Sequence, residues 1–446
     1  MAISLSDHFT YSRLLRFVLP CIGTMLFTSI YGIVDGLCVS NFVGKTAFAA
    51  VNLIMPVPML VGSVGFMLGT GGSAIVGITL GEGDQKKADR YFTLFLLAAL
   101  VSVSVLAVLG IVFLRPIAVL LGAKGELLDY AVRYGRILMV SLPTFALQNM
   151  FQSFFVTAEK PHLGFWFTVG AGCTNMVLDV LMVGVWGWGV EGAAIATFIS
   201  QLVGGVLPVF YFIDRSNSSR LHLCKTSFYS KVLRDACING SSELMTNLSM
   251  SLVNILYNYQ LLRLAGENGV AAYGVIMYAA FLFVAVFVGY AVGSAPIVSF
   301  HYGARNHAEV HNLYRKSLRL IAVVAVTLTL ASMFIIPCVA RIFVGYDAEL
   351  LALTSRAFRL YALSFLIMGF NVYASSFFTA LGDGVTSALI SFLRTLAFQV
   401  IAILLLPLLL GIDGIWLAVT AAELAALAVS AAMLLTKDKV FHYRKA

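Results

Sequence analysis

The sequence predicts an all-α integral membrane protein, and three observations support that class: the composition, a series of long uncharged runs and an internal repeat. Of the 446 residues, 60% are hydrophobic and only 11% are charged, whereas about 25% of the residues in soluble domains are charged. A soluble fold of this length cannot bury so much apolar surface. The composition therefore excludes soluble enzymes, nucleic-acid-binding proteins and disordered scaffolds, and it makes the lipid bilayer an expected partner.

Twelve transmembrane helices are expected, because twelve runs are long enough to cross a bilayer and nearly free of charge. A spanning helix needs about 20 mainly apolar residues. Strands of a barrel would alternate polar and apolar residues, and these runs do not. Eleven runs of at least 18 residues contain no Asp, Glu, Lys or Arg, and a twelfth, 414–436, is interrupted only by Glu423. The eleven are 17–34, 46–81, 91–114, 137–158, 161–178, 192–213, 244–262, 268–304, 320–340, 360–382 and 395–412.

The distribution of Lys and Arg between the loops predicts the orientation. With the N-terminus in the cytoplasm, 19 Lys and Arg residues fall on the inner side and nine on the outer side. Cytoplasmic loops of membrane proteins are enriched in these residues. We therefore expect a multi-pass protein of the cell membrane with both termini in the cytoplasm.

The two halves of the sequence repeat each other. A shift of about 222 residues aligns, in the same order, 43–56 with 265–278, 72–81 with 293–303, 154–161 with 377–384 and 189–196 with 411–418. Each half holds six expected helices, so both enter the membrane from the same side, as parallel repeats related by a pseudo-two-fold axis along the membrane normal do. This predicts two six-helix lobes, an N-lobe (1–213) and a C-lobe (231–446), joined by a cytoplasmic linker (214–230).

Two lobes that face each other leave a cleft on their shared axis, and this arrangement suits alternating access. One chain supplies both lobes, so a monomer is expected. The GKT sequence at 44–46 resembles the end of a phosphate-binding loop, but Val39 stands where that loop requires glycine. Without a nucleotide site, an ion gradient is the expected energy source.

The expected spans contain five ionisable residues. Each costs roughly 2.5–3.5 kcal/mol at the centre of a spanning helix, so each is a functional candidate. The structural alternative is a buried ion pair or a side chain that faces a cavity. The five are Asp35, Asp179, Glu243, Arg394 and Glu423.

Five oxygen-bearing side chains fall into one layer of the N-lobe. At about 1.5 Å per residue, Asp35 lies about 9 Å and Asp179 about 12 Å below the outer surface. Thr197 lies about 10 Å, Tyr31 about 15 Å and Asn175 about 18 Å below it. Hard oxygen ligands suit a proton or a hard cation such as sodium. The layer is therefore a candidate cation-coupling site, and no other metal or cofactor is expected.

Across nearly all of its length the chain resembles the multidrug and toxic compound extrusion (MATE) transporters, which have twelve helices in two six-helix lobes. The resemblance implies that five polar positions bind the coupling proton or sodium ion, and that the first helix bends at a proline. The residues that carry it are Pro20, fifteen positions before Asp35, then Tyr31 with Asp35, Asn175-x-x-x-Asp179, and Thr197 in GAAIAT.

The C-lobe is expected to lack a cation site. One branch of the MATE family couples sodium partly through acids on its seventh and tenth helices, but the run 360–382 contains Asn371 and no acid. Arg394 and Glu423 lie about 25 Å and about 15 Å below the outer surface, a gap that a long Arg side chain nearly closes. An ion pair that stabilises the C-lobe is our first interpretation, and a substrate contact in the cleft is the second.

Polar, methionine and aromatic side chains near the expected cleft are candidate substrate contacts. Methionine and aromatic faces accept varied apolar cations through soft packing and cation–π contact. The alternative for each of them is ordinary helix packing. The candidates are Gln148, Asn149, Phe155, Glu243, Met277, Tyr278, Phe281, Asn371, Tyr373 and Phe377.

Together these features predict a cation-coupled antiporter, driven by protons or sodium, that exports amphipathic and in particular cationic organic compounds by alternating access. The main alternative is a flippase for lipid-linked oligosaccharides, although such flippases often have fourteen helices and several cationic residues along the cleft. A membrane-embedded enzyme or receptor is the third alternative. It would need a catalytic cluster or a soluble domain, and the sequence reveals neither.

Overall fold

Helices form all of the regular secondary structure in the part of the chain that the computed structural model describes. That part is residues 3–345 and 347–444, without the side chains of 36, 37, 39–41, 45, 48, 342 and 343. The first half contains α1 (Tyr11–Phe42), α2 (Lys45–Ile54), α3 (Pro56–Gly81), α4 (Gln85–Leu120), α5 (Glu126–Thr157), α6 (Pro161–Asp179), the π-helical turn η1 (Val180–Val185), α7 (Gly189–Gly205) and α8 (Leu207–Ile213). The second half contains α9 (Ser230–Gly303), α10 (His307–Val344), α11 (Ala348–Ala362), α12 (Phe365–Ala380), α13 (Gly384–Phe392), the π-helical turn η2 (Leu393–Ala397), α14 (Phe398–Leu410), α15 (Ile412–Thr436) and α16 (Asp438–Phe441).

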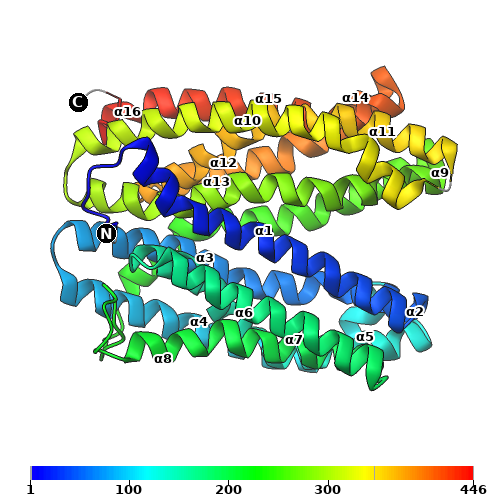
Figure 1. Cartoon of the computed structure of the whole chain (residues 1–446), viewed down its shortest axis with the longest axis horizontal. Helices are drawn as coiled ribbons and strands as arrows, with labels where there is room; N and C mark the ends of the chain where they lie inside the picture. Colours follow the sequence, from blue (N-terminus) through cyan, green and yellow to red (C-terminus); the bar gives the residue numbers. More distant parts are fainter. Residues whose placement is uncertain (1–2, 346, 445–446) are drawn as a thin grey trace.

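These helices are arranged in two layers. Figure 1 shows α2–α8 together in one layer and α9–α16 together in the other, with α1 along the boundary, where it contacts α6 and α9. Both termini lie at the same end of the long axis, which we call the terminus side. The segment between the two halves, residues 214–229, contains no helix. The two layers therefore correspond to the two halves of the sequence.

Among the described residues, nine helices are long and apolar enough to cross a membrane, or ten if the bent pair α11–α12 is one span. That count takes α9 once, although its 74 residues contain two helices that meet at Gly266 (φ 62°, ψ −151°). The rings of Tyr257 and Tyr273 stack at 4.9 Å, so the chain folds back between them. The count also omits α5, which has 32 residues. The all-helical membrane fold is confirmed, and the number of helices that cross the bilayer stays a prediction.

A proline divides one of the predicted runs. The sequence predicts a single element across 46–81, but the chain forms α2 and α3 there, on either side of Met55. Pro56 is the first residue of α3. Proline fits the first turn of a helix but cannot donate the hydrogen bond that would continue the preceding one. The prediction of one element is wrong here because it considered charge and length without proline.

The internal repeat is visible in the backbone of the turns. Four positions with positive φ in the first half align with four in the second half at the shift found in the sequence. Positive φ favours glycine, because a β-carbon is crowded there. In two of the pairs a charged residue nevertheless adopts the conformation that glycine adopts in the other half. The pairs are Gly44 (108°) with Gly266 (62°), Gly83 (87°) with Arg305 (54°), Glu159 (61°) with Gly382 (82°) and Gly189 (61°) with Gly411 (60°).

The two layers touch where glycines let the backbones approach. A β-carbon on Gly240 of α9 would collide with the carbonyl oxygen of Met67 on α3, and one on Gly71 would lie 2.5 Å from the nitrogen of Gly240. In the other arm of α9, Gly289 lies against the backbone of Ile22 on α1. Gly71, Gly240, Gly289 and Ile22 fall in the halves of their helices nearer to the terminus side, and Met67 lies at the middle of α3. The layers are therefore closed against each other at that end.

The segment before α1 also joins the two layers. The Leu5 N–H donates to Glu159, in the turn between α5 and α6, at 2.8 Å. The Phe9 N–H donates to Glu309 on α10 at 2.8 Å, and the Phe9 carbonyl accepts from Lys316 at 2.6 Å. One short non-helical segment thus holds a carboxylate of each layer on the terminus side.

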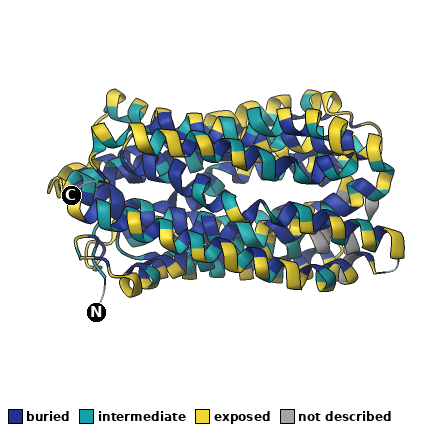
Figure 2. Ribbon diagram, turned by 90° about the horizontal axis from the view of Figure 1, so that it is seen from above, coloured by how far each residue is buried: buried dark blue, intermediate teal, exposed yellow. Residues whose placement is uncertain are grey.

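The outer surface of the bundle is apolar. On α4, Val101, Val105, Val108 and Val112 recur at helical spacing, and each is more than half exposed. Figure 2 shows exposed residues along the outside of the two layers and buried residues toward their interior. An apolar stripe of this length on the outside of a helical bundle is what contact with lipid tails requires.

Candidate functional site

Two carboxyl groups, one buried and one half-buried, lie beside each other in the first layer. Asp35 is on α1 and Asp179 is the last residue of α6, and their carboxyl groups are within hydrogen-bonding reach of each other. Asp179 is 0% exposed. Apart from this contact, no donor in the described part of the chain binds Asp35 Oδ1 or either oxygen of Asp179. Two adjacent carboxylates repel each other unless a proton or a cation is bound between them.

Asn175 and Tyr31 complete one face of this site. Asn175 lies one turn before Asp179, is 2% exposed, and its Nδ2 has no acceptor among the described residues. Tyr31 packs against Gly172, which lies on the same face of α6. It is also within electrostatic range of Asp35. The structure therefore brings four of the five predicted coupling residues together on α1 and α6.

Thr197 and Pro20, the remaining residues predicted for this site, make contacts within their own helices. The Thr197 hydroxyl donates to the Ala193 carbonyl on α7 at 3.0 Å. Pro20 lies inside α1, which continues through it as one helix, and its carbonyl accepts from the Thr24 hydroxyl at 2.9 Å. Proline leaves one helical hydrogen bond unmade, so α1 is easiest to bend there. A cation contact from Thr197 and a hinge at Pro20 stay predictions.

The sequence analysis missed Tyr134 on α5. This side chain is fully buried, its hydroxyl has no partner in the described part of the chain, and it lies within electrostatic range of Asp35 and Asp179. It stands between Arg133 and Arg136, so the division of the chain by charge places it in an outer loop. Helix α5 in fact extends through both arginines. A continuous helical pattern across the charged stretch is the signal that could have revealed it.

A π-helical turn adjoins each of two groups of charged residues, Asp35 with Asp179 in the first layer and Arg394 with Glu423 in the second. η1 begins directly after Asp179, and η2 contains Arg394. A π-helical turn inserts a residue into the α-helical pattern and redirects the side chains that follow, and such turns are frequent at functional sites. The backbone therefore marks the same two places as the charges do.

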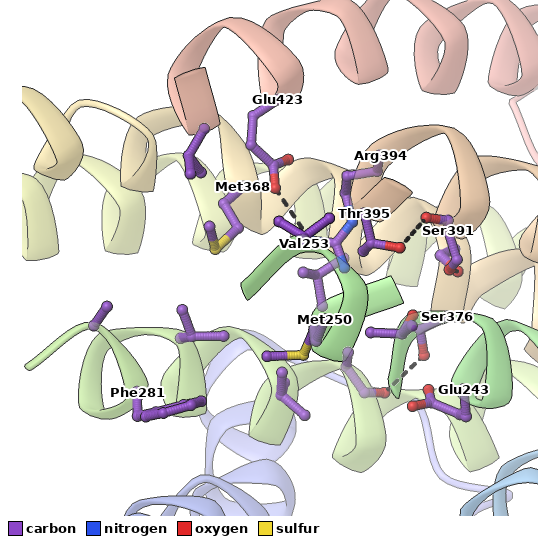
Figure 3. A pocket seen from close by; sticks show the side chains of 18 of the residues that line it. Glu243, Met250, Val253, Phe281, Met368, Ser376, Ser391, Arg394, Thr395 and Glu423 are labelled. Atoms are coloured by element: carbon purple, nitrogen blue, oxygen red, sulfur yellow. Dashed lines mark hydrogen bonds and ion pairs between the residues drawn. The ribbon is translucent and has the colours of Figure 1, made fainter. Parts of the chain in front are cut away.

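A cavity of about 420 Å³ opens among the helices of the second layer. We call it the C-lobe cavity, and Figure 3 shows it from close by. Its lining includes three of the predicted cleft residues, Glu243, Met277 and Phe281, together with Arg394 and Glu423. It also reaches the first layer, from which Thr70, Ser73 and Ser153 contribute. Drug-sized ligands occupy cavities of roughly 300–1,000 Å³.

The other predicted cleft residues do not line this cavity. Tyr278 is 40% exposed, and the remaining six are buried within α5 or α12. Their burial fits helix packing: Phe155, for example, stacks on Phe167 at 5.4 Å. A substrate contact by any of these seven stays a prediction. The six buried residues are Gln148, Asn149, Phe155, Asn371, Tyr373 and Phe377.

Arg394 and Glu423 form an ion pair at the wall of the C-lobe cavity. Arg394 Nη1 donates to Glu423 Oε1 at 3.2 Å, and the two side chains are 12% and 1% exposed. The other carboxylate oxygen accepts from Asn371 Nδ2 at 2.7 Å. Asn371 in turn accepts from the Ser430 hydroxyl at 2.8 Å. Glu423 is thus fixed from two sides: by Arg394, the partner that the sequence analysis expected, and by Asn371, whose contact with Glu423 the sequence did not indicate.

Glu243, on the first arm of α9, is the third charged residue of the C-lobe cavity. It lies within electrostatic range of Arg394. No hydrogen bond or ion pair within the described residues reaches its carboxyl group, and Figure 3 shows it apart from the Arg394–Glu423 pair. Its carboxyl group is therefore available to a ligand.

Comparison with known sequences identifies one family over both halves of the chain. A sequence model of the family described as MatE matches residues 20–181 and again residues 244–405. The multidrug export protein MepA of Staphylococcus saprophyticus is 21% identical over 436 residues, which cover 96% of this chain and 95% of MepA. MepA of Staphylococcus aureus strain MSSA476 is 22% identical over 433 residues, with the same coverage of 96% and 95%.

Solved structures share the same fold. A MATE transporter crystallised in complex with MaL6 superimposes with a TM-score of 0.92 at 22% identity, over 98% of each chain. A multidrug resistance MATE family transporter of the MOP superfamily, in its outward-facing conformation, gives a TM-score of 0.91 at 23% identity, over 97% of this chain and 96% of that one. The family model matches one segment in each half of the chain, and these segments include Asp35, Asp179 and Arg394.

Proposed function

The chain belongs to the MatE family, and from that premise we propose that it is an antiporter in which a proton or sodium ion, held by Asp35 and Asp179, drives the export of amphipathic organic compounds, cationic ones among them. The coarser activity follows from the family: the chain is a multi-pass membrane transporter of small molecules, and it is not an enzyme. The relatives are described as multidrug export proteins, which favours export over the flipping of lipid-linked oligosaccharides.

The observation that carries this proposal is the pair of adjacent carboxyl groups without a donor. Asp35 and Asp179 meet in an apolar lobe, and neither Asp179 oxygen has a donor from the described residues. A bound proton or sodium ion would remove their repulsion, and Tyr31 and Asn175 would add oxygen ligands. Because the two residues lie on different helices, a change in the charge between them changes the force between α1 and α6.

The closed end of the structure indicates the side from which the cation enters in an alternating-access cycle. The layers are closed against each other on the terminus side, where Gly240 meets Met67. With both termini in the cytoplasm, as the charge bias predicts, this conformation opens to the outside. A cation entering from outside would bind the carboxyl pair, bend α1 at Pro20 and lower the affinity for substrate. A ligand shifts such an equilibrium only by binding the two conformations unequally, and the carboxyl pair supplies that difference.

Dye efflux from cells that express the chain tests the activity and the coupling ion. The proton gradient and the sodium gradient are collapsed in separate experiments. The expected result is efflux of amphipathic cationic dyes that stops when one of these two gradients is lost. The gradient whose loss stops efflux identifies the ion. Efflux that survives the loss of both gradients would contradict ion-coupled antiport.

Substitution of the carboxyl pair tests the site. Asp35→Asn and Asp179→Asn keep side-chain size but remove the charge, so each is expected to reduce gradient-driven efflux to the level of cells without the transporter, while the purified protein still folds and binds dye. Glu243→Gln is the matched control in the other lobe, and at saturating dye it is expected to remain coupled. Near wild-type pumping by Asp35→Asn, or loss of coupling in Glu243→Gln alone, would overturn the assignment.

A further inference from the structure

We infer that the C-lobe cavity recognises zwitterionic amphiphiles, which join an apolar body to both an ammonium and a carboxylate group. This inference rests on the proposed export function and narrows its substrate class. It follows from two opposite charges, Arg394 and Glu243, that line one cavity. The coupling mechanism uses neither of them.

Arg394 has hydrogen-bond donors to spare. A guanidinium carries five N–H donors in a planar fork, and one of its nitrogens, Nη1, donates to Glu423. Its Nε is buried without an acceptor among the described residues. An unpaired buried donor is costly, and a ligand carboxylate would satisfy it in the forked geometry that guanidinium groups favour. Figure 3 shows the Arg394 side chain reaching into the middle of the cavity, between Glu423 and Glu243.

Glu423 is not free to accept a hydrogen bond from a ligand ammonium, because both of its carboxylate oxygens already have partners. Its second oxygen is held by Asn371, which is itself held by Ser430. Glu243, by contrast, lines the cavity without a partner for its carboxyl group in the described part of the chain. A ligand ammonium would find its acceptor there.

The arrangement of the three charges disfavours ligands with a single charge. Glu423 and Arg394 neutralise each other, so Glu243 leaves one negative charge on the cavity wall. A cation can pair with Glu243 but leaves the free Arg394 donors unsatisfied. An anion can reach Arg394 but is repelled by both carboxylates. Arg394 and Glu243 form no ion pair with each other within the described residues, and a zwitterion can satisfy both from the space between them.

The remaining walls fit an apolar body. Four large apolar side chains line the cavity, three of them methionines, whose flexible thioethers adapt to varied shapes. The volume of about 420 Å³ suits an aromatic group with a short polar tail. The four are Met250, Met277, Phe281 and Met368.

Three fluorescent ligands with the same body separate the contributions of the two charges. Nε-dansyl-lysine is a zwitterion, dansylcadaverine is the same molecule without the carboxylate, and dansyl-6-aminohexanoic acid is the same molecule without the ammonium. Their affinities for the purified full-length chain at neutral pH are measured by dansyl fluorescence. We expect the zwitterion to bind at least about tenfold more tightly than either singly charged ligand.

Variants assign this preference to the two residues. The double variant Arg394→Met/Glu423→Gln removes the pair without leaving a lone buried charge, and it is expected to bind the zwitterion and the cation equally. Glu243→Gln is expected to bind the zwitterion and the anion equally. Arg394→Lys keeps the charge but loses the fork, so it should retain only part of the preference. Arg356→Gln, at an exposed ion pair with Asp413 outside the cavity, is the control and should change none of the three affinities.

Equal binding of all three ligands by the wild type, or an unchanged preference in the double variant, would overturn the inference. The failure of the proposed function would look different. A chain that exports cationic dyes but shows no preference for the zwitterion contradicts only the inference. A chain that binds the zwitterion but exports no dye contradicts only the proposed function.

Discussion

A guanidinium inside an apolar lobe is tolerated only when a carboxylate compensates its charge. The side chains of Arg394 and Glu423 are 12% and 1% exposed, so both ions have lost nearly all of their hydration. The desolvation of such a pair can exceed the attraction between its charges, so the pair adds little net stability. Removing one partner alone, however, leaves an uncompensated buried charge. The pair therefore matters more for where it places the guanidinium than for stability.

This argument predicts a non-additive mutant series. Arg394→Met and Glu423→Gln are each expected to lower the free energy of unfolding by about 3–5 kcal/mol, and the double variant is expected to lose much less than the sum. Thermal unfolding and expression yield of the three purified variants measure this. Additive losses would show that the two side chains contribute independently.

At the scale of the residue, the sequence reveals charges better than it reveals their neutral partners. Asp35, Asp179 and Arg394 stand out because an ion inside a membrane span is costly. Tyr134 and Ser430 are neutral, and such residues occur throughout membrane helices in ordinary packing roles. Tyr134 is distinguished by a buried hydroxyl without a partner among the described residues, and Ser430 by its hydrogen bond to Asn371. Both features depend on the folded arrangement.

At the scale of the element, the contact between α3 and α9 decides which end of the molecule is closed. Gly240 of α9 approaches Met67 so closely that no β-carbon fits between the two backbones. Small residues allow such approach in membrane proteins, where packing rather than the hydrophobic effect holds helices together. The contact exists only while the terminus side is closed, so it stabilises this conformation selectively.

Gly240→Ala is therefore expected to shift the conformational equilibrium. The added methyl group should disfavour the closed terminus side by about 1–3 kcal/mol, the usual cost of overpacking. Spin labels on the exposed positions Lys86 and Ala308, one in each layer, should then report a longer distance. Gly274→Ala, in the other arm of α9, is the matched control, because a β-carbon at Gly274 meets nothing within 4 Å. An unchanged distance in Gly240→Ala would contradict the assigned role of this contact.

Helices whose ends are marked by charged residues were predictable from the sequence. Helices that end at a proline or at a glycine with positive φ were harder to predict. The uncharged runs identify nearly every helix, because each loop between them carries charges. Proline at Pro56 and glycine at Gly266 reshape the chain with no change in polarity, so a division by charge does not resolve them. The aligned positive-φ pair Gly189 and Gly411 shows that these turns nevertheless follow the repeat.

At the scale of the whole molecule, the two halves share a backbone but carry different chemistry. The carboxyl pair Asp35 and Asp179 lies in the first layer, and the shift that aligns the halves places Tyr257 and Ile401 at the equivalent positions. The buried guanidinium of Arg394 lies in the second layer. A duplicated fold thus supports one lobe for the coupling ion and, in our inference, another for the ligand. The sequence predicts that the coupling carboxylates belong to the N-lobe alone, but it does not predict which end of the molecule is closed, because that depends on contacts between the layers.

The orientation in the membrane determines the direction of transport, and it rests on the distribution of Lys and Arg between the loops. Two exposed positions at opposite ends of the bundle test it: Ser218, between α8 and α9, and Lys124, between α4 and α5. All six native cysteines are free, and Cys173 and Cys338 are exposed, so single cysteines are introduced into a cysteine-free background.

In intact cells a membrane-impermeant maleimide is expected to label Lys124→Cys and not Ser218→Cys, and permeabilised cells should label both. The reason is that 19 Lys and Arg residues, against nine, fall on the side assigned to the cytoplasm. Cationic loops resist translocation, and the bias is strong enough to fix one orientation. With this orientation, the closed terminus side faces the cytoplasm and the structure opens to the outside, as export by exchange with an inward-moving cation requires. Labelling of Ser218→Cys from outside would reverse the orientation, and with it the direction of substrate movement.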